Sequence, residues 1–224
     1  MAHQVMVPVQ AQDQRYIMTY EEFLTKIDEH AHAEWVEGEV TVFAKPTIAH
    51  QQLRGFLSTL LVCYVHTLGL GEILVAPCEM RLLPGRSSRE PDILLVSTVH
   101  RHRLTEDRLE GPADLVIELL SDSSIMRDRD RKFYEYQEAG IPEYWVFDPR
   151  PGKQRADFYQ LSAAGKYEVV ALDDAGRYHS AVLPGFWLRP EWAWQDPQPD
   201  YITLLLQIDP GLVRAVLQRA QVDE

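Results

Sequence analysis

One carboxylate stands inside an otherwise apolar run of this chain. Residues 115–120 read Leu-Val-Ile-Glu-Leu-Leu, and a continuous apolar run of this length is typical of a strand buried on both faces. An ionised glutamate in that position, Glu118, is costly unless it has a cationic partner, a metal ion or a proton. Glu118 is therefore the first candidate for a functional residue.

A second carboxylate, Asp92, opens another short apolar run at residues 92–96. Two acids on adjacent strands can converge on one divalent cation, and Mg²⁺ prefers one or two carboxylates together with water and substrate phosphate oxygens. A cation held in this way polarises a phosphate and lowers the pKa of bound water, as phosphodiester hydrolysis requires. A lysine close by, such as Lys132, would add a positive charge or orient that water.

Each of these residues also has a simpler structural explanation. Glu118 is compatible with a buried ion pair or with backbone hydrogen bonds, and Asp92 with the capping of a strand or a turn. Lys132 lies four residues after Asp128 and three before Glu135, a spacing typical of exposed ion pairs on a helix. The residue types alone leave a metal site and an ordinary packing role both open.

The elements that would position these side chains follow from hydrophobic periodicity and from capping signals. A core is predicted from a helix over 47–68, a strand over 72–83 that is interrupted at Pro77, strands over 91–96 and 115–120, a helix over 125–139 and a strand over 144–147. Polar residues 121–124 are suited to cap the second helix, and residues 84–89 are expected to form a loop. A capping box opens a short helix near residue 19, a strand is expected at 39–44, a hairpin at 155–172 and helical segments at 201–220. We therefore expect an α/β fold with an αβββαβ core, in which helices flank a mixed sheet, followed by a C-terminal hairpin and helices.

Length and composition limit the possibilities further. The 224 residues suit one domain, which we place at 19–224 after a flexible arm at 1–18. The formal net charge of −12 argues against a surface that binds nucleic acid everywhere, but ten of the 22 basic and ten of the 34 acidic residues fall in 81–132, so this segment is neutral. Two cysteines, no signal peptide and no membrane-spanning run predict a cytoplasmic protein without membrane contact.

Around these acids the chain resembles the Uma family of restriction-endonuclease-like proteins, within the PD-(D/E)XK nuclease superfamily. The similarity covers roughly residues 19–190 in the family's order, and its motifs are Glu34–Glu39, Ala44–His50, Pro91-Asp92, Asp114–Ser121, Arg131-Lys132, Gly140–Asp148 and Leu183–Phe186. The resemblance implies a restriction-endonuclease-like fold in which Asp92 and Glu118 bind Mg²⁺ or Mn²⁺. It further implies that Glu34 is a third acid near the metal and that Lys132 is catalytic.

The chain departs from the standard signature at the lysine. That signature places a lysine two residues after the glutamate, where this chain has Leu120. In the Uma family the lysine has moved to the following helix, and Lys132 occupies the matching position. His50 also matches the family, although it is equally compatible with an ordinary place in the first turn of a helix, and Glu34 with a solvated turn.

Two functions from different classes remain. The first is a metal-dependent endonuclease that hydrolyses DNA phosphodiesters, expected as a homodimer because cutting a duplex commonly uses two sites. The second is a catalytically inactive nuclease-fold protein that serves as a binding or assembly module, which the acidic composition favours. A dinucleotide-binding or P-loop enzyme is excluded because neither glycine motif occurs.

Overall fold

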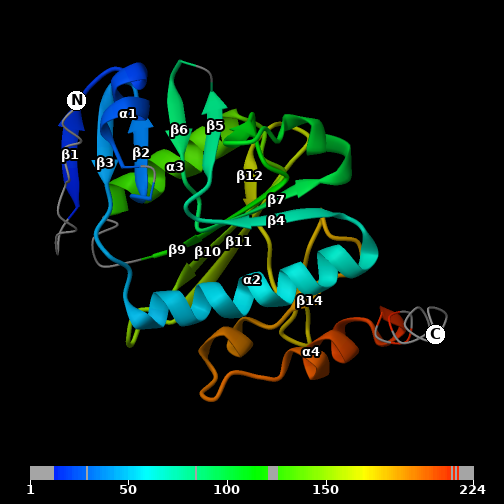
Figure 1. Cartoon of the computed structure of the whole chain (residues 1–224). Helices are drawn as coiled ribbons and strands as arrows, with labels where there is room; N and C mark the ends of the chain where they lie inside the picture. The colour runs from blue at the N-terminus through cyan, green and yellow to red at the C-terminus, as the bar shows by residue number, and fades with distance from the viewer. Residues whose placement is uncertain are drawn as a thin grey trace, which may run out of the picture.

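Two six-stranded sheets and their flanking helices make up the structure (Figure 1), a computed structural model that describes residues 13–28, 30–83, 85–120, 126–212, 214 and 216. The central sheet has the strand order β12-β11-β10-β9-β7-β4. Its strands are β4 (Gly71–Val75), β7 (Ile93–Ser97), β9 (Leu115–Leu119), β10 (Glu143–Asp148), β11 (Arg155–Leu161) and β12 (Tyr167–Val169). Strands β9 and β10 run parallel and the other neighbours antiparallel, so the sheet is mixed.

Two helices cover opposite faces of the central sheet (Figure 1): α2 (Ile48–Leu68) and α3 (Met126–Glu138). Successive side chains of a strand point to opposite faces of the sheet, so alternate residues of the buried strands pack on the α2 side and on the α3 side. Ile93 and Ile117 belong to the core formed with α2, whereas Leu94 and Val116 belong to the core formed with α3. The order α2, β4, β7, β9, α3, β10 confirms the predicted αβββαβ core.

The ends of α2 follow the signals in its sequence. The Thr47 side chain accepts a hydrogen bond from the His50 amide at the N-terminus, and Gly69 adopts a left-handed conformation at the C-terminus. The first turn of α2 is therefore held in a defined position, which matters because His50 reaches the candidate site from there. The cap predicted at 121–124 and the distal part of the helix predicted over 201–220 lie outside the described residues.

A second sheet, which the sequence patterns did not predict as a unit, packs beside α3 (Figure 1). Its strands are β1 (Gln14–Ile17), β2 (Ala33–Val36), β3 (Glu39–Val42), β5 (Glu79–Leu83), β6 (Ser87–Arg89) and β8 (Arg108–Glu110) in the order β1-β3-β2-β6-β5-β8, next to α1 (Tyr20–Lys26). Residues 14–17, expected within the flexible arm, form β1, and residues 87–89, expected within a loop, form β6. The strand predicted over 72–83 divides at Pro77 into β4 and β5, one in each sheet.

The C-terminal part of the chain runs beneath α2 (Figure 1). It contains β13 (Tyr178–His179), β14 (Trp187–Leu188), the short helix η2 (Pro190–Trp194) and α4 (Tyr201–Ile208). Another short helix, η1 (Thr98–Arg103), follows β7. The described helices include none that is both long and apolar enough to span a membrane.

A single buried carboxylate fastens the segment around β13 to the central sheet. Glu143 opens β10, is fully buried and accepts hydrogen bonds from three side chains and two backbone amides. The donors are the Trp145 indole, the Tyr178 and Ser180 hydroxyls and the amides of Ala181 and Val182. A carboxylate is suited to this position because it accepts from every donor and offers none of its own.

Replacing this acceptor should destabilise the fold. Glu143→Gln places amide hydrogens against donors, and we expect it to lower the free energy of unfolding by about 2–4 kcal/mol in urea titrations. Glu168→Gln on the exposed edge of β12 is the matched control and should have little effect. Equal stability of the two variants would contradict this role for Glu143.

Candidate active site

Asp92 and Glu118 lie side by side at one end of the central sheet. Ile93 pairs with Ile117 in the antiparallel register of β7 and β9, so continuing the register by one residue places Asp92 opposite Glu118. The Leu119 amide donates to Asp92 Oδ2 at 2.8 Å, which fixes the carboxylate against β9. His50, from the first turn of α2, brings its Nε2 to 3.2 Å from Asp92 Oδ1.

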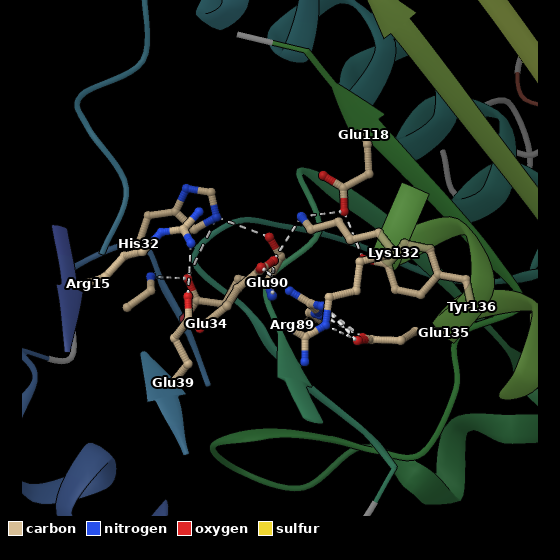
Figure 2. A network of polar contacts seen from close by, with 12 residues as sticks. Arg15, His32, Glu34, Glu39, Arg89, Glu90, Glu118, Lys132, Glu135 and Tyr136 are labelled. Atoms are coloured by element: carbon tan, nitrogen blue, oxygen red, sulfur yellow. Dashed lines mark hydrogen bonds and ion pairs between the residues drawn. The ribbon is translucent and has the colours of Figure 1, made fainter. Parts of the chain in front are cut away.

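Lys132 connects Glu118 to the second sheet (Figure 2). Its Nζ lies 2.9 Å from Glu118 Oε1 and 2.8 Å from Glu34 Oε1. The Tyr136 hydroxyl, one helical turn after Lys132, donates to the same Glu118 oxygen at 2.7 Å. These groups are shielded from water, with exposed fractions of 2% for Glu34, 4% for Asp92, 8% for Glu118 and 9% for Lys132.

Glu34 is held from a second direction by Arg89 (Figure 2). Arg89 Nη1 donates to Glu34 Oε2 at 2.8 Å, and the Glu90 amide donates to Glu34 Oε1 at 3.2 Å. The rest of the Arg89 guanidinium makes a two-pronged contact with Glu135, with both distances at 2.9 Å. Such paired hydrogen bonds fix the planes of both groups.

The two carboxylates that share Lys132 differ in their affinity for a proton. Burial would raise the pKa of Glu34, but Lys132 and Arg89 outweigh it and lower that pKa to about 2. Burial raises the pKa of Glu118 to about 7; Lys132 opposes this shift, while the charges of Asp92 and Glu34 add to it. Glu118 is thus the acid whose negative charge is least compensated.

Asp92 and Lys132 both remain charged at neutral pH. Burial would raise the pKa of Asp92, but the contact with His50 and the hydrogen bond from the Leu119 amide outweigh it and keep the pKa below its usual value. Burial would lower the pKa of Lys132, but the Glu118 and Glu34 carboxylates raise it above the usual value for lysine. Lys132 can therefore supply positive charge and hydrogen bonds, whereas it is not suited to act as a base.

The donor set fits a divalent cation. Buried or partly buried carboxylates here outnumber the cationic side chains: Glu34, Asp92, Glu118 and the partly buried Glu135 surround Lys132 and Arg89. The described residues contain no cluster of three or more histidine, cysteine or acidic side chains arranged to hold a metal ion. Asp92 and Glu118, opposite each other in the register of neighbouring strands, match the preference of Mg²⁺ for one or two carboxylates, water and phosphate oxygens.

The structure brings all four predicted site residues into one region. Lys132 is buried between carboxylates rather than exposed on its helix, and Glu34 lies on β2 rather than in a solvated turn. Glu118 forms a buried ion pair, as a purely structural role would require, and its partner is Lys132. Metal binding by Asp92, Glu118 and Glu34 stays a prediction.

Sequence reasoning missed Arg89 and Tyr136 and left His50 undecided. Tyr136 carried a usable signal, because residues four apart on a helix share a face and Tyr136 follows Lys132 at that spacing. Arg89 carried none, because it stands in a segment that reads as a loop. Its neighbour Glu90 is also buried, and burial together with the charges of Glu34 and Glu79 raises the pKa of Glu90 to about 8.

The Glu90 carboxyl predicts a pH-dependent stability. It keeps its proton up to about pH 8 in the folded chain but releases it near pH 4.5 when unfolded, so its contribution is complete below pH 4.5 and is lost as the pH rises to about 8. In EDTA, Glu90→Gln should be more stable than wild type at pH 9, on the order of 3 kcal/mol, with a smaller difference at pH 5. Urea unfolding at several pH values measures this, with the exposed Glu106→Gln as control. A difference that does not change with pH would contradict the prediction.

Comparisons with known proteins identify the fold and the family of the chain. The structure is similar to the crystal structure of "a putative nuclease belonging to DUF820" from Anabaena variabilis, with a TM-score of 0.63. The two sequences are 18% identical, and the match covers 78% of this chain and 96% of the other chain. At this identity the likeness shows the fold alone, and it supports the restriction-endonuclease-like architecture expected from the motifs. None of the curated proteins compared matches the chain.

A family model places the chain more firmly. The model described as "Putative restriction endonuclease" matches residues 19–191, which is well over half of the sequence, and the match includes all four predicted site residues. It confirms the resemblance inferred from the motifs. The chain belongs to the Uma2 family.

Proposed function

We propose that the protein is a metal-dependent endonuclease of the PD-(D/E)XK type that hydrolyses phosphodiester bonds of DNA. One observation carries the proposal: Asp92 and Glu118 stand side by side on antiparallel strands, and an ammonium group lies 2.9 Å from Glu118. The family description and the restriction-endonuclease-like fold support the same reaction class. Mg²⁺ is the proposed cofactor, with Mn²⁺ as its usual substitute in experiments.

Each side chain of the site has a part in this reaction. A cation bound to Asp92 and Glu118 would polarise the scissile phosphate and activate a water molecule. His50 and the Leu119 amide orient Asp92, and Tyr136 orients Glu118. Lys132, which stays protonated, places positive charge where the phosphate gains negative charge and can orient the attacking water.

DNA as substrate and a homodimer as the active form belong to the same proposal. Asp92 and Glu118 would form one metal site per chain, so cutting both strands of a duplex at once would use two copies of the chain. Cys63 and Cys78 are both free thiols, which fits a reducing cytoplasm.

A catalytically inactive binding module is the alternative. Its support is that the acids already have partners within the chain: Lys132 bridges Glu118 and Glu34, and His50 contacts Asp92. Under this alternative the buried ion pairs serve only to connect the two sheets, and no divalent cation would bind with useful affinity.

Metal titration separates the two functions. Calorimetric titration of Mn²⁺ should show saturable binding to wild type that is lost in Asp92→Asn and in Glu118→Gln, because each substitution removes a charged ligand. Cleavage of plasmid DNA in Mg²⁺ should fall by at least about a hundredfold in the same variants. Asp114→Asn is the matched control, because Asp114 is a buried acid of the same sheet that binds the Ser97 amide and His100 away from the site.

Binding that is equal in wild type and Asp92→Asn would place the metal elsewhere. Retained cleavage by Glu118→Gln, with the fold intact by circular dichroism, would contradict the catalytic role of Glu118. Mn²⁺ binding without any cleavage of duplex or single-stranded DNA would favour the binding module.

A further inference from the structure

Glu34 differs from the other site acids in where it comes from and in what it contacts. Asp92 and Glu118 belong to the central sheet, whereas Glu34 lies on β2 of the second sheet. Both of its oxygens are engaged: Oε1 contacts Lys132 at 2.8 Å and the Glu90 amide at 3.2 Å, and Oε2 contacts Arg89 at 2.8 Å. A metal ion at Glu34 would share this carboxylate with two cations, which oppose its binding.

The position of Glu34 is fixed by a closed loop of contacts (Figure 2). Arg89 on β6 binds Glu34 with one nitrogen and Glu135 with two others. Glu135 lies on α3 three residues after Lys132, and Lys132 itself contacts Glu34, which closes the loop. Because paired guanidinium and carboxylate groups are geometrically specific, this loop sets the place of the Glu34 carboxylate without any help from Glu118.

Glu118 holds Lys132 in a different way. The ammonium and the Tyr136 hydroxyl both contact its Oε1, and the carboxylate faces Asp92 across the strand register. A divalent cation on Glu118 and Asp92 would repel a neighbouring ammonium, since like charges a few ångströms apart repel strongly where little water screens them. Lys132 would then need a second anion to stay in the site, and Glu34 is the acid already in contact with it.

We propose that Glu34 is a positioning residue rather than a metal ligand: it keeps the Lys132 ammonium at the site while a divalent cation occupies Asp92 and Glu118. This inference rests on the proposed metal-dependent function and replaces the role for Glu34 suggested by its family position. It also gives the second sheet a function, because β2 supplies Glu34, which holds the lysine of α3, and β6 supplies Arg89, which holds Glu34.

A double-mutant cycle on Mn²⁺ affinity tests the inference. Glu34→Asp keeps the negative charge but shortens the side chain so that it no longer reaches Lys132. The ammonium is then left to Glu118 and competes with the cation, so Mn²⁺ affinity should fall on the order of tenfold. In the Lys132→Met background no ammonium competes, so Glu34→Asp should change the affinity by less than about twofold.

If Glu34 were instead a direct metal ligand, Glu34→Asp would weaken Mn²⁺ binding by the same factor in the wild-type and in the Lys132→Met background. That result would overturn the inference. Glu39→Asp is the matched control, since Glu39 lies on the neighbouring strand β3 with a side chain 37% exposed and pairs with Arg15. Thermal unfolding checks that each variant is folded, and Lys132→Gln replaces Lys132→Met if the latter is not.

A second readout needs no metal and keeps the inference separate from the proposed function. In EDTA, the rate of reductive methylation of Lys132, followed by mass spectrometry, reports how firmly the ammonium is held. Glu34→Asp and Arg89→Lys should raise the rate roughly tenfold, whereas Glu118→Gln, which leaves the contact between Lys132 and Glu34 in place, should raise it less. If Glu118→Gln and Glu34→Asp increase the methylation rate of Lys132 equally, the positioning role of Glu34 is overturned even if Mn²⁺ binds. If Glu34 protects Lys132 from methylation but Mn²⁺ does not bind, only the proposed nuclease function is refuted.

Discussion

A single buried ammonium group, shared by two carboxylates, is the interaction on which the site depends. The Lys132 Nζ lies within 3 Å of an acid from each sheet, and it is shielded from water. Ion pairs of this kind are tolerated in a protein interior only when their remaining hydrogen-bonding groups are also satisfied. Arg89, Tyr136 and the Glu90 amide meet that condition for the two acids.

The arrangement leaves negative charge unbalanced at one place. Glu34 has two cationic partners and a pKa of about 2, whereas Glu118 has one cation, faces Asp92 and has a pKa of about 7. A carboxyl group in this condition takes up either a proton or a metal ion, depending on which is available. In the proposed mechanism Glu118 therefore takes the cation, and Glu34 remains the partner of the lysine.

The helices and strands of the αβββαβ core could be predicted because the signals for each element lie within its own short stretch of sequence. Apolar runs at 92–96 and 115–120, capping at Thr47 and the glycines that end both helices specify elements that tertiary contacts then only assemble. The acids on these runs were found for the same reason, since a charge inside a buried strand is conspicuous.

The residue patterns alone could not predict the second sheet, although the family resemblance implied that Glu34 of β2 lies near the site. Strands such as β2 and β6 have three or four residues, too few to show a period, and they are stabilised by partners distant in sequence. Lys132 looked like half of a surface ion pair because spacing along α3 does not reveal what lies opposite. Arg89 gave no signal at all, although it determines the position of Glu34.

The most direct test of this account is a crystal structure of the protein soaked with Mn²⁺, with the metal located by its anomalous scattering. The account predicts one peak with an oxygen of Asp92 and an oxygen of Glu118 each about 2 Å away, while Lys132 remains in contact with Glu34. A peak ligated by Glu34, with Lys132 displaced from it, would contradict the positioning role. No peak at the Asp92 and Glu118 carboxylates, with or without a DNA oligonucleotide, would contradict the metal-dependent nuclease itself.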